Sequence, residues 1–148
     1  MKTRKALIFV IVLAVLTGIA AIMHLSTREK VAEGSVQIAY NDETYSLNQE
    51  ELDYIQVSGV RVNGKGEEKP VEGQGILLKD ILAEYEITEY ENVTIISDDS
   101  YSAEVSFAEV SEDGKVYLMY EEEELRLIVF GDVNSKRSVS NVVQIVVE

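Results

Sequence analysis

The 148-residue sequence contains no cysteine, and this absence excludes several kinds of site at once. Without a thiolate the chain forms no disulfide, holds no iron–sulfur cluster, ligates no metal through sulfur and carries no lipid on cysteine. The only histidine, His24, lies at the end of an N-terminal apolar run, so a histidine-based site is excluded from the rest of the chain. Tryptophan is absent as well, which leaves tyrosine as the main aromatic residue. We assign no catalytic and no metal-ligating residue.

Positive charge is scarce outside the N-terminus. The chain has 13 Lys and Arg against 27 Asp and Glu, a formal net charge of -14. Residues 1–30 hold five of the basic residues and one of the acids, so 8 basic and 26 acidic residues remain in the other 118. A surface of this charge repels nucleic acid and anionic lipid, so we expect no nucleic-acid partner. The usual role of such an acidic surface is to keep the protein soluble through repulsion between its molecules.

One long apolar run lies at the N-terminus. Lys2, Arg4 and Lys5 precede residues 6–25, which carry no charge. At about 1.5 Å rise per residue, a helix of this length crosses a bilayer core of about 30 Å. The positive charges before it favour a cytoplasmic N-terminus. We therefore expect residues 1–27 to form a signal anchor, an uncleaved transmembrane helix, and residues 28–35 to form a linker.

A cleaved signal peptide is the alternative for this segment. Gly18, Ala20 and Ala21 offer a cleavage site, although the apolar run continues beyond them. Both readings place residues 36–148 outside the cytoplasmic membrane. The first gives a single-pass protein of the cell membrane, with the membrane as its partner, and the second gives a secreted form.

Residues 36–148 are rich in short strands. Asn63-Gly64 predicts a hairpin, Gly59 a bulge, and Pro70, the only proline, an edge position. The predicted strands cover residues 36–40, 44–47, 54–62, 67–71, 92–97, 101–106, 115–120, 125–129 and 142–147. A run of four acids, residues 121–124, predicts a solvated turn rather than a Ca²⁺ site, because adjacent residues in a strand point to opposite sides.

One segment has a helical pattern. Residues 76–85 place apolar side chains at i, i+3, i+4 and i+7, namely Leu78, Ile81, Leu82 and Tyr85. We expect this helix to pack on the sheet. Many short strands, one clear helix and short links predict an α+β fold with a mixed or largely antiparallel sheet.

The C-terminal part reads as two strands joined by a tight polar loop, because the run of residues 125–132 is answered by residues 137–147, with 142–147 as the closing strand. The second strand is apolar on both faces, which indicates a buried position in the sheet. Arg126, Lys136 and Arg137 carry almost all the positive charge here. An arginine fork holds a phosphate or carboxylate through two parallel hydrogen bonds, so a small anionic ligand would bind at this loop. The alternative is that these residues pair with the domain's own acids.

Tyrosines are spread through the same region. Tyr85, Tyr90, Tyr101, Tyr117 and Tyr120 could line a ligand groove. The simpler interpretation is that they are half-buried at the core or its rim, because an aromatic ring with one polar tip suits such positions.

Four segments of residues 75–147 resemble the sulfite-oxidase-like molybdopterin-binding domain family. Residues 75–82 read GILLKDIL, similar to that family's GVPLxDLL segment, and residues 93–105 read VTIISDDSYSAEV, similar to its VxxxSxDGYSxxV hairpin. Residues 116–121, VYLMYE, resemble its vlLAYE strand. The run LRLIVFG at 125–131, followed by RSV at 137–139, resembles its LRLVVPG…RSV end. The order and spacing of the four segments agree with the family.

The resemblance implies the family's α+β fold and makes molybdopterin a possible cofactor. It places Arg137 near a pterin phosphate, with Arg126 bracing the same loop and Ser138 beside them as the cofactor-binding residues. The sequence departs from the family at important points: the cysteine that ligates molybdenum is missing, Phe130 replaces a proline, and Ser140 replaces a lysine.

These departures decide the expected function. We expect a non-catalytic binding or accessory domain, with a protein partner or a small anionic ligand. An active molybdopterin-dependent oxidoreductase, or a subunit of one, is the alternative. A purely structural protein–protein module is a third possibility; an exposed apolar patch or an open sheet edge would distinguish it.

Overall fold

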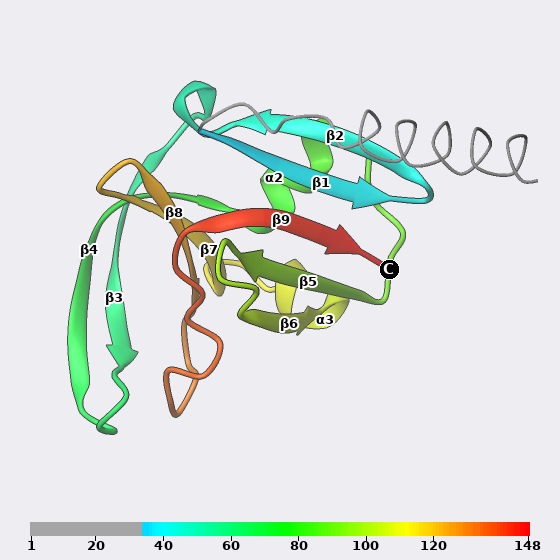
Figure 1. Cartoon of the computed structure of the whole chain (residues 1–148). Helices are drawn as coiled ribbons and strands as arrows, with labels where there is room; N and C mark the ends of the chain where they lie inside the picture. Colours follow the sequence, from blue (N-terminus) through cyan, green and yellow to red (C-terminus); the bar gives the residue numbers. More distant parts are fainter. Residues whose placement is uncertain (1–33) are drawn as a thin grey trace, which may run out of the picture. The chain divides into compact units, whose positions relative to one another are not determined.

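The computed structural model describes residues 34–148. The expected signal anchor over residues 1–27, His24, and all but the last two residues of the expected linker lie outside these described residues. Within residues 34–148, no helix has the length and apolar character needed to cross a membrane. The described part is a sheet-rich α+β fold with few helices (Figure 1), in agreement with the fold class that the sequence predicts.

Nine strands and three short helical elements make up this part. The strands are β1 (Ser35–Tyr40), β2 (Glu43–Asn48), β3 (Ile55–Val62), β4 (Glu68–Leu77), β5 (Asn92–Ser97), β6 (Ser102–Ser106), β7 (Val116–Glu121), β8 (Glu124–Val129) and β9 (Val142–Val147). The helical elements are the 3-10 turn η1 (Gln49–Glu51), α2 (Leu78–Glu84) and α3 (Phe107–Ser111).

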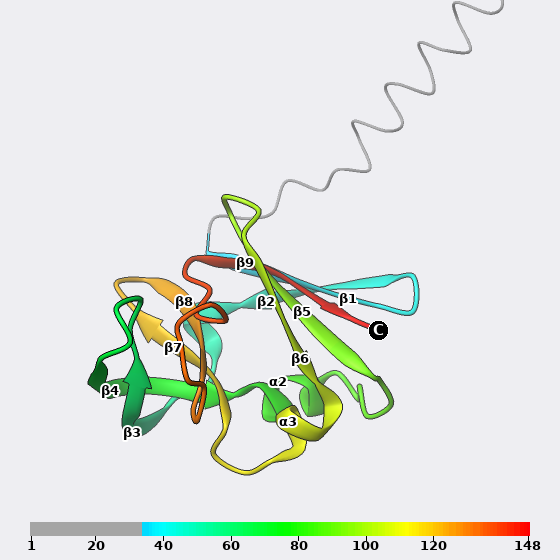
Figure 2. The ribbon, with the colours of Figure 1, turned by 90° about the horizontal axis from the view of Figure 1, so that it is seen from below.

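The first sheet has five strands in the order β2-β1-β9-β5-β6. β9 pairs in parallel with β1 and antiparallel with β5, so the last strand of the chain lies at the centre of this mixed sheet (Figures 1 and 2). Val142, Ile145 and Val147 of β9 are buried in the core, and the residues between them are half-buried. A central position explains why the strand is apolar on both faces, and it confirms the predicted burial.

The second sheet is antiparallel, with the order β3-β4-β7-β8. β3 and β4 form the predicted hairpin, in which the Asn63 N–H donates to the Glu67 carbonyl at 2.9 Å. Pro70 pairs with Val60 of β3, whereas β7 joins β4 only over residues 74–77. The proline therefore lies where β4 has a partner strand on one side alone, which confirms the predicted edge position.

The predicted bulge at Gly59 is wrong. Gly59 pairs with Val71 in a regular register, and the register shift in this fold lies instead between Ile96 and Ser97. The glycine serves a different purpose: a Cβ atom added to it would lie 2.5 Å from Cε1 of Phe130. Gly59 thus lets the ring of Phe130 lie directly over the backbone of β3.

The main core lies between the two sheets and includes the buried face of α2. Leu78, Ile81 and Leu82 face this core, as the helical pattern predicts. The helix begins at Leu78 rather than at residue 76, because Ile76 and Leu77 still pair with β7 as part of β4. A second, smaller core lies on the other face of the second sheet and consists of the buried residues Val57, Val71, Met119 and Ile128.

The prediction that a tight loop joins the two C-terminal strands is wrong, because these strands belong to different sheets. β8 pairs with β7 in the four-stranded sheet, and β9 belongs to the five-stranded sheet. Residues 130–141 cross from one sheet to the other, and the Leu127 N–H donates to the Val139 carbonyl at 2.8 Å. Apolar periodicity identifies the face of a strand that meets the core, but it does not identify the partner strand. A strand in either of two facing sheets turns its apolar face to the same core, so its pattern is the same in both.

Candidate functional site

The loop of residues 130–141, called the crossing loop below, has a defined shape. Its Lys136 N–H donates to Oδ1 of Asn134 at 3.0 Å, and its Ser138 N–H donates to the Ser135 carbonyl at 3.0 Å. Val139 is fully buried in the main core and anchors the end of the loop. The hydroxyl of Tyr101, the residue just before β6, donates to the Lys136 carbonyl. The side chains of this loop are therefore presented from a fixed backbone.

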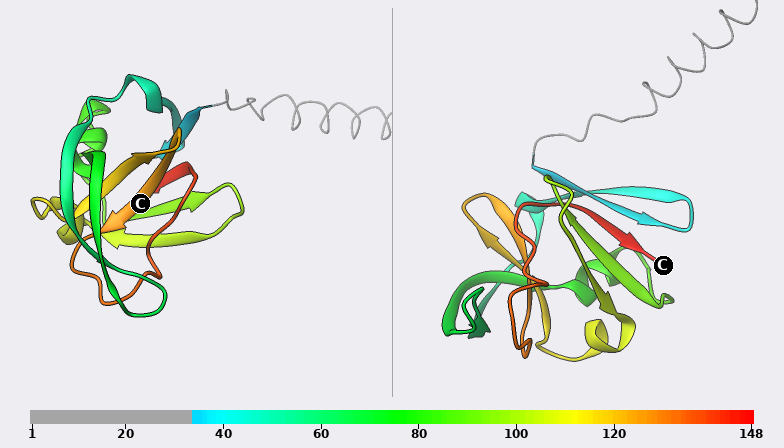
Figure 3. Two further views of the ribbon diagram at one scale, coloured as in Figure 1. Left: turned by 90° about the vertical axis from the view of Figure 1, so that its left-hand side faces the viewer. Right: turned by 60° about the horizontal axis from the view of Figure 1, so that its bottom comes forward.

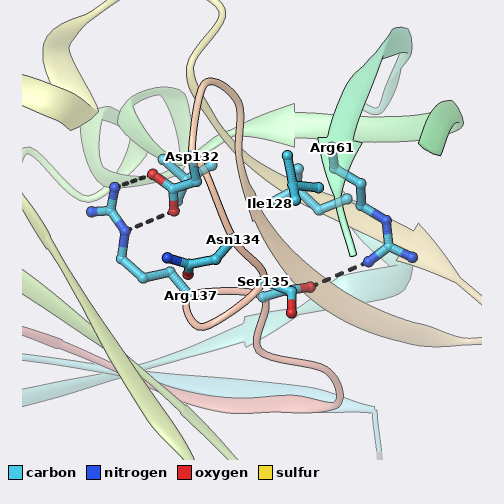
Figure 4. Close-up of a pocket in the computed structure, with 9 residues that line it drawn as sticks. Arg61, Ile128, Asp132, Asn134, Ser135 and Arg137 are labelled. Atoms are coloured by element: carbon cyan, nitrogen blue, oxygen red, sulfur yellow. Dashed lines mark hydrogen bonds and ion pairs between the residues drawn. The ribbon is translucent and has the colours of Figure 1, made fainter. Parts of the chain in front are cut away.

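Arg137 is saturated by two carboxylates of the same chain. Its Nε donates to Oδ2 of Asp132 at 2.8 Å, and its Nη2 also donates to that carboxylate (Figure 4). On the other side, Nη1 and Nη2 donate to Oε2 and Oε1 of Glu109 at 2.9 and 2.8 Å. The Asp132 and Glu109 carboxylates raise the pKa of Arg137 further above its ordinary value. The predicted alternative, pairing with the domain's own acids, is confirmed for this residue.

Glu109 connects this network to the start of α3. Its Oε2 accepts from the Ser106 N–H at 3.0 Å, and the Ser106 hydroxyl accepts from the Glu109 N–H at 3.3 Å, which makes a capping box. The hydrogen bonds from Arg137, together with those from Ser106, lower the pKa of the Glu109 carboxyl to about 2. Glu109 therefore caps a helix and fastens the crossing loop with one carboxylate.

Arg126 lies apart from this network. It lines a separate small pocket of about 40 Å³ with Ser140 and Asn141, beside the acidic turn between β7 and β8. Its Nε is 3.1 Å from Oε2 of Glu121, yet this buried atom has no hydrogen bond to any residue of the range 34–148. Of the three residues that the sequence groups as cofactor-binding, the structure brings only Arg137 and Ser138 to one pocket.

The pocket beside Ser138 contains an arginine that sequence reasoning missed. Nη1 of Arg61, from the end of β3, donates to the Ser138 hydroxyl at 3.5 Å. Arg61 and Arg137 lie on opposite sides of the crossing loop (Figure 4). The pocket between them has a volume of about 20 Å³, which is room for about one water molecule. The alternation of side chains along β3 could have indicated Arg61, because it places this residue on the same face of the strand as Val57 and Gly59.

The remaining predicted features are distributed over the domain. Glu121 and Glu124 pair across the end of the β7–β8 hairpin, and Glu122 and Glu123 form its exposed turn with φ values of 52° and 67°, which confirms the predicted solvated turn. No group of three or more acidic, histidine or cysteine side chains within residues 34–148 is arranged to hold a metal ion. The lining of an open hollow of about 490 Å³ beside the β1–β2 turn includes the acids Asp42, Glu43 and Glu148 and no basic residue.

The tyrosines pack against the cores and do not line one groove. The rings of Tyr54 and Tyr120 stack at 5.0 Å beside the main core, where burial raises the pKa of Tyr54. Tyr117 meets Phe130 edge to face at 5.6 Å beside the smaller core. Tyr85 and Tyr90 are also half-buried, and Tyr101 is 48% exposed. The half-buried position is confirmed for four of the five predicted tyrosines, and Tyr101 is the exception.

The sequence matches no protein-family model and no curated protein.

Proposed function

We propose that this chain is a membrane-anchored, extracytoplasmic binding or accessory domain of the sulfite-oxidase-like molybdopterin-binding type, without redox chemistry of its own. The observation that carries the proposal is the state of Arg137. The resemblance matches this residue to a position near a pterin phosphate, yet both sides of its guanidinium already hold the carboxylates of Asp132 and Glu109. A phosphate would have to displace two charge-assisted contacts that the chain supplies itself.

The surroundings of Arg137 do not fit a resident molybdopterin. The chain has no thiolate for molybdenum, and the pocket beside Arg137 has a volume of about 20 Å³. A pterin needs far more room, since ligand pockets measure about 300–1,000 Å³. Arg126, the second arginine that the resemblance implies, lines a different pocket. The α+β order of elements over residues 75–147 supports the family's fold, and these local differences argue against its chemistry.

The membrane location rests on the sequence of residues 1–27. An apolar run of bilayer length that follows three positive charges favours an anchor with the acidic domain outside the cytoplasm. The strong negative charge of the domain would keep it off an anionic lipid surface. Fractionation of cells that produce the full chain tests this part: we expect the protein in the membrane fraction, with residues 34–148 accessible to protease from outside.

Cofactor content tests the non-catalytic role. The full chain is produced in cells that synthesise molybdenum cofactor and purified in mild detergent, and its molybdenum and pterin are measured together with sulfite oxidase activity. We expect background amounts of both and no turnover. One molybdenum and one pterin per chain, with turnover, would establish the alternative of an active oxidoreductase. An Arg137→Ala variant is the matched control, because a genuine pterin phosphate contact would be lost in it.

A further inference from the structure

We infer that Arg61, Lys65, Lys136 and Ser138 form a binding site for an oxyanion, the phosphate or carboxylate group of a ligand that otherwise remains outside the protein. The site lies where the tip of the β3–β4 hairpin faces the crossing loop. This inference rests on the proposed function and deepens it, since it names the class of ligand that the binding domain takes.

The first argument is the distribution of unpaired charge. Residues 34–148 contain eight basic residues, and five of them form ion pairs with acids, namely Lys69, Lys79, Lys115, Arg126 and Arg137. Arg61, Lys65 and Lys136 form no ion pair with any described residue. The same region contains 25 acidic residues. If the charged side chains were placed at random, each basic side chain would be expected to have an acidic partner. All three belong to the two segments that face each other.

The second argument is geometric. The guanidinium of Arg61 reaches across to the Ser138 hydroxyl, and a Cβ atom on Gly64 would lie 3.6 Å from the Ser135 hydroxyl oxygen. Lys65 follows Gly64, and Lys136 follows Ser135, so each lysine is next in sequence to a residue of this contact. Figures 1 and 3 show the tip of the hairpin and the crossing loop at the same end of the second sheet.

The third argument concerns hydrogen bonds. Within residues 34–148, the only hydrogen bond of the Arg61 side chain is the 3.5 Å contact to Ser138, at the long limit for a hydrogen bond. A guanidinium has five N–H donors in a planar fork, so most of its capacity remains available. An oxyanion beside Arg61 would accept hydrogen bonds from two of these N–H groups, and the Ser138 hydroxyl could donate a hydrogen bond to the same anion.

Arg137 is a positioning residue for this site and not a ligand. Its contacts with Asp132 and Glu109 hold the crossing loop while keeping both carboxylates occupied. The pocket of about 20 Å³ admits part of an oxyanion, and the remainder of the ligand has to stay at the surface. The exposed lysines on both sides would then meet the outer charge of the ligand.

The test uses the full, ¹⁵N-labelled chain in zwitterionic detergent, titrated with sodium phosphate at constant ionic strength. Sodium acetate forms a second arm, for the carboxylate source, and sodium chloride is the control. We expect saturable amide shifts at residues 64–65 and 135–138 with at least one of the two oxyanions. The arm that saturates, or saturates first, identifies the preferred group. Shifts that are absent with both, or equal to those with chloride, overturn the inference.

Variants locate the site. Arg61→Gln should weaken phosphate or acetate binding about tenfold or more, because the charge-assisted contact to the anion is lost. Arg61→Lys should retain part of the affinity, and Lys136→Gln should lower it by a smaller factor. Lys115→Gln is the matched control, since Lys115 already pairs with Glu112. An unchanged dissociation constant in a folded Arg61→Gln protein, judged by its dispersed amide spectrum, would show that Arg61 is not the anchor.

The same samples separate this inference from the proposed function. A stoichiometric molybdenum and pterin content contradicts the non-catalytic role, whatever the titration gives. Saturable phosphate or acetate binding that depends on Arg61, in a chain free of cofactor, supports both proposals. A chain free of cofactor that binds neither anion leaves the non-catalytic role standing and removes the oxyanion site.

Discussion

The two arginines on either side of the crossing loop are in opposite states. Arg137 donates to two carboxylates. The side chains of Arg137, Glu109 and Asp132 are only 28%, 26% and 20% exposed to solvent. Arg61 meets a single hydroxyl at the limit of hydrogen-bond length and no carboxylate among residues 34–148. In a strongly acidic domain the first state stabilises the fold, and the second leaves a positive charge available for a ligand.

The degree of shielding explains why the two states differ in energy. Lys69 and Glu67, an exposed pair at 3.7 Å, retain more than half of their exposure and contribute little, because water competes for both charges. The Arg137 network is more shielded, and one cation serves two acids. Removing this cation leaves two partly buried carboxylates facing each other. We therefore expect the side of the loop that holds Arg137 to dominate stability and the side that holds Arg61 to dominate binding.

The largest effect is expected for Arg137→Met. The substitution keeps much of the side-chain volume but leaves Glu109 and Asp132 without their shared cation, which should lower the free energy of unfolding by about 2–3 kcal/mol. Urea denaturation followed by circular dichroism measures this loss. Lys115→Met, which removes a single ion pair with the exposed Glu112, is the control and should cost less than about 0.5 kcal/mol. Equal losses in the two variants would contradict the comparison.

The next effect concerns acid stability. Arg137 and Ser106 lower the pKa of Glu109 to about 2 in the folded state from an ordinary value of 4.5. A depressed pKa of this kind gives stability that is complete above pH 4.5 and is lost as the pH falls toward 2. In Glu109→Gln the fall in unfolding free energy between pH 6 and pH 2.5 should be smaller than in the unmodified chain, by roughly 2 kcal/mol. Identical pH profiles would rule out this role for the carboxylate.

A smaller effect should follow from closing the space over β3. In Gly59→Ala the new methyl group would meet the ring of Phe130 at 2.5 Å, so the ring must move, at a cost of about 1–2 kcal/mol. Gly73→Ala is the control, because its methyl group finds an ordinary contact of 3.6 Å with Met119. The cost at Gly59 should decrease in a Phe130→Leu background. A cost that is independent of residue 130 would disprove the contact.

The smallest change is expected for Arg61→Gln. Without ligand this substitution should alter the free energy of unfolding by less than about 0.5 kcal/mol, since one long hydrogen bond to Ser138 is lost. Phosphate at ten times its dissociation constant should stabilise the unmodified chain by about 1.4 kcal/mol and the variant by less. Thermal unfolding with and without phosphate measures both values. A large loss of stability without ligand would mean that Arg61 has a structural role like that of Arg137.

Much of the fold could be predicted from the sequence, because local patterns carry local structure. The Asn63-Gly64 pair predicted the β3–β4 hairpin, Pro70 its unpaired edge, and the spacing of Leu78, Ile81 and Leu82 the helix α2. Which strands pair with each other was harder to predict from the sequence. The C-terminal pattern predicted two strands joined by a tight loop, but residues 124–129 and 142–147 lie in different sheets.

The candidate site was predictable only in part. The scarcity of basic residues pointed to the crossing loop, and it also suggested the pairing that Arg137 makes with Asp132. The second carboxylate, Glu109, lies 28 residues away along the chain, and Arg61 lies 77 residues from Ser138. Contacts over such separations depend on how the two sheets pack, which no local pattern encodes. Arg126 was grouped with Arg137 by proximity in sequence, and the crossing loop separates them.

The central place of β9 has a consequence for the order in which this sheet can form. Among residues 34–148, β1 and β5 are joined only through β9, which follows both of them in sequence. The five-stranded sheet therefore cannot close until residues 142–147 have emerged from the ribosome. Until then β1 and β2 form an isolated hairpin, which is at best marginally stable in water. The hairpin of β1 and β2 gains its parallel partner only when residues 142–147 are present.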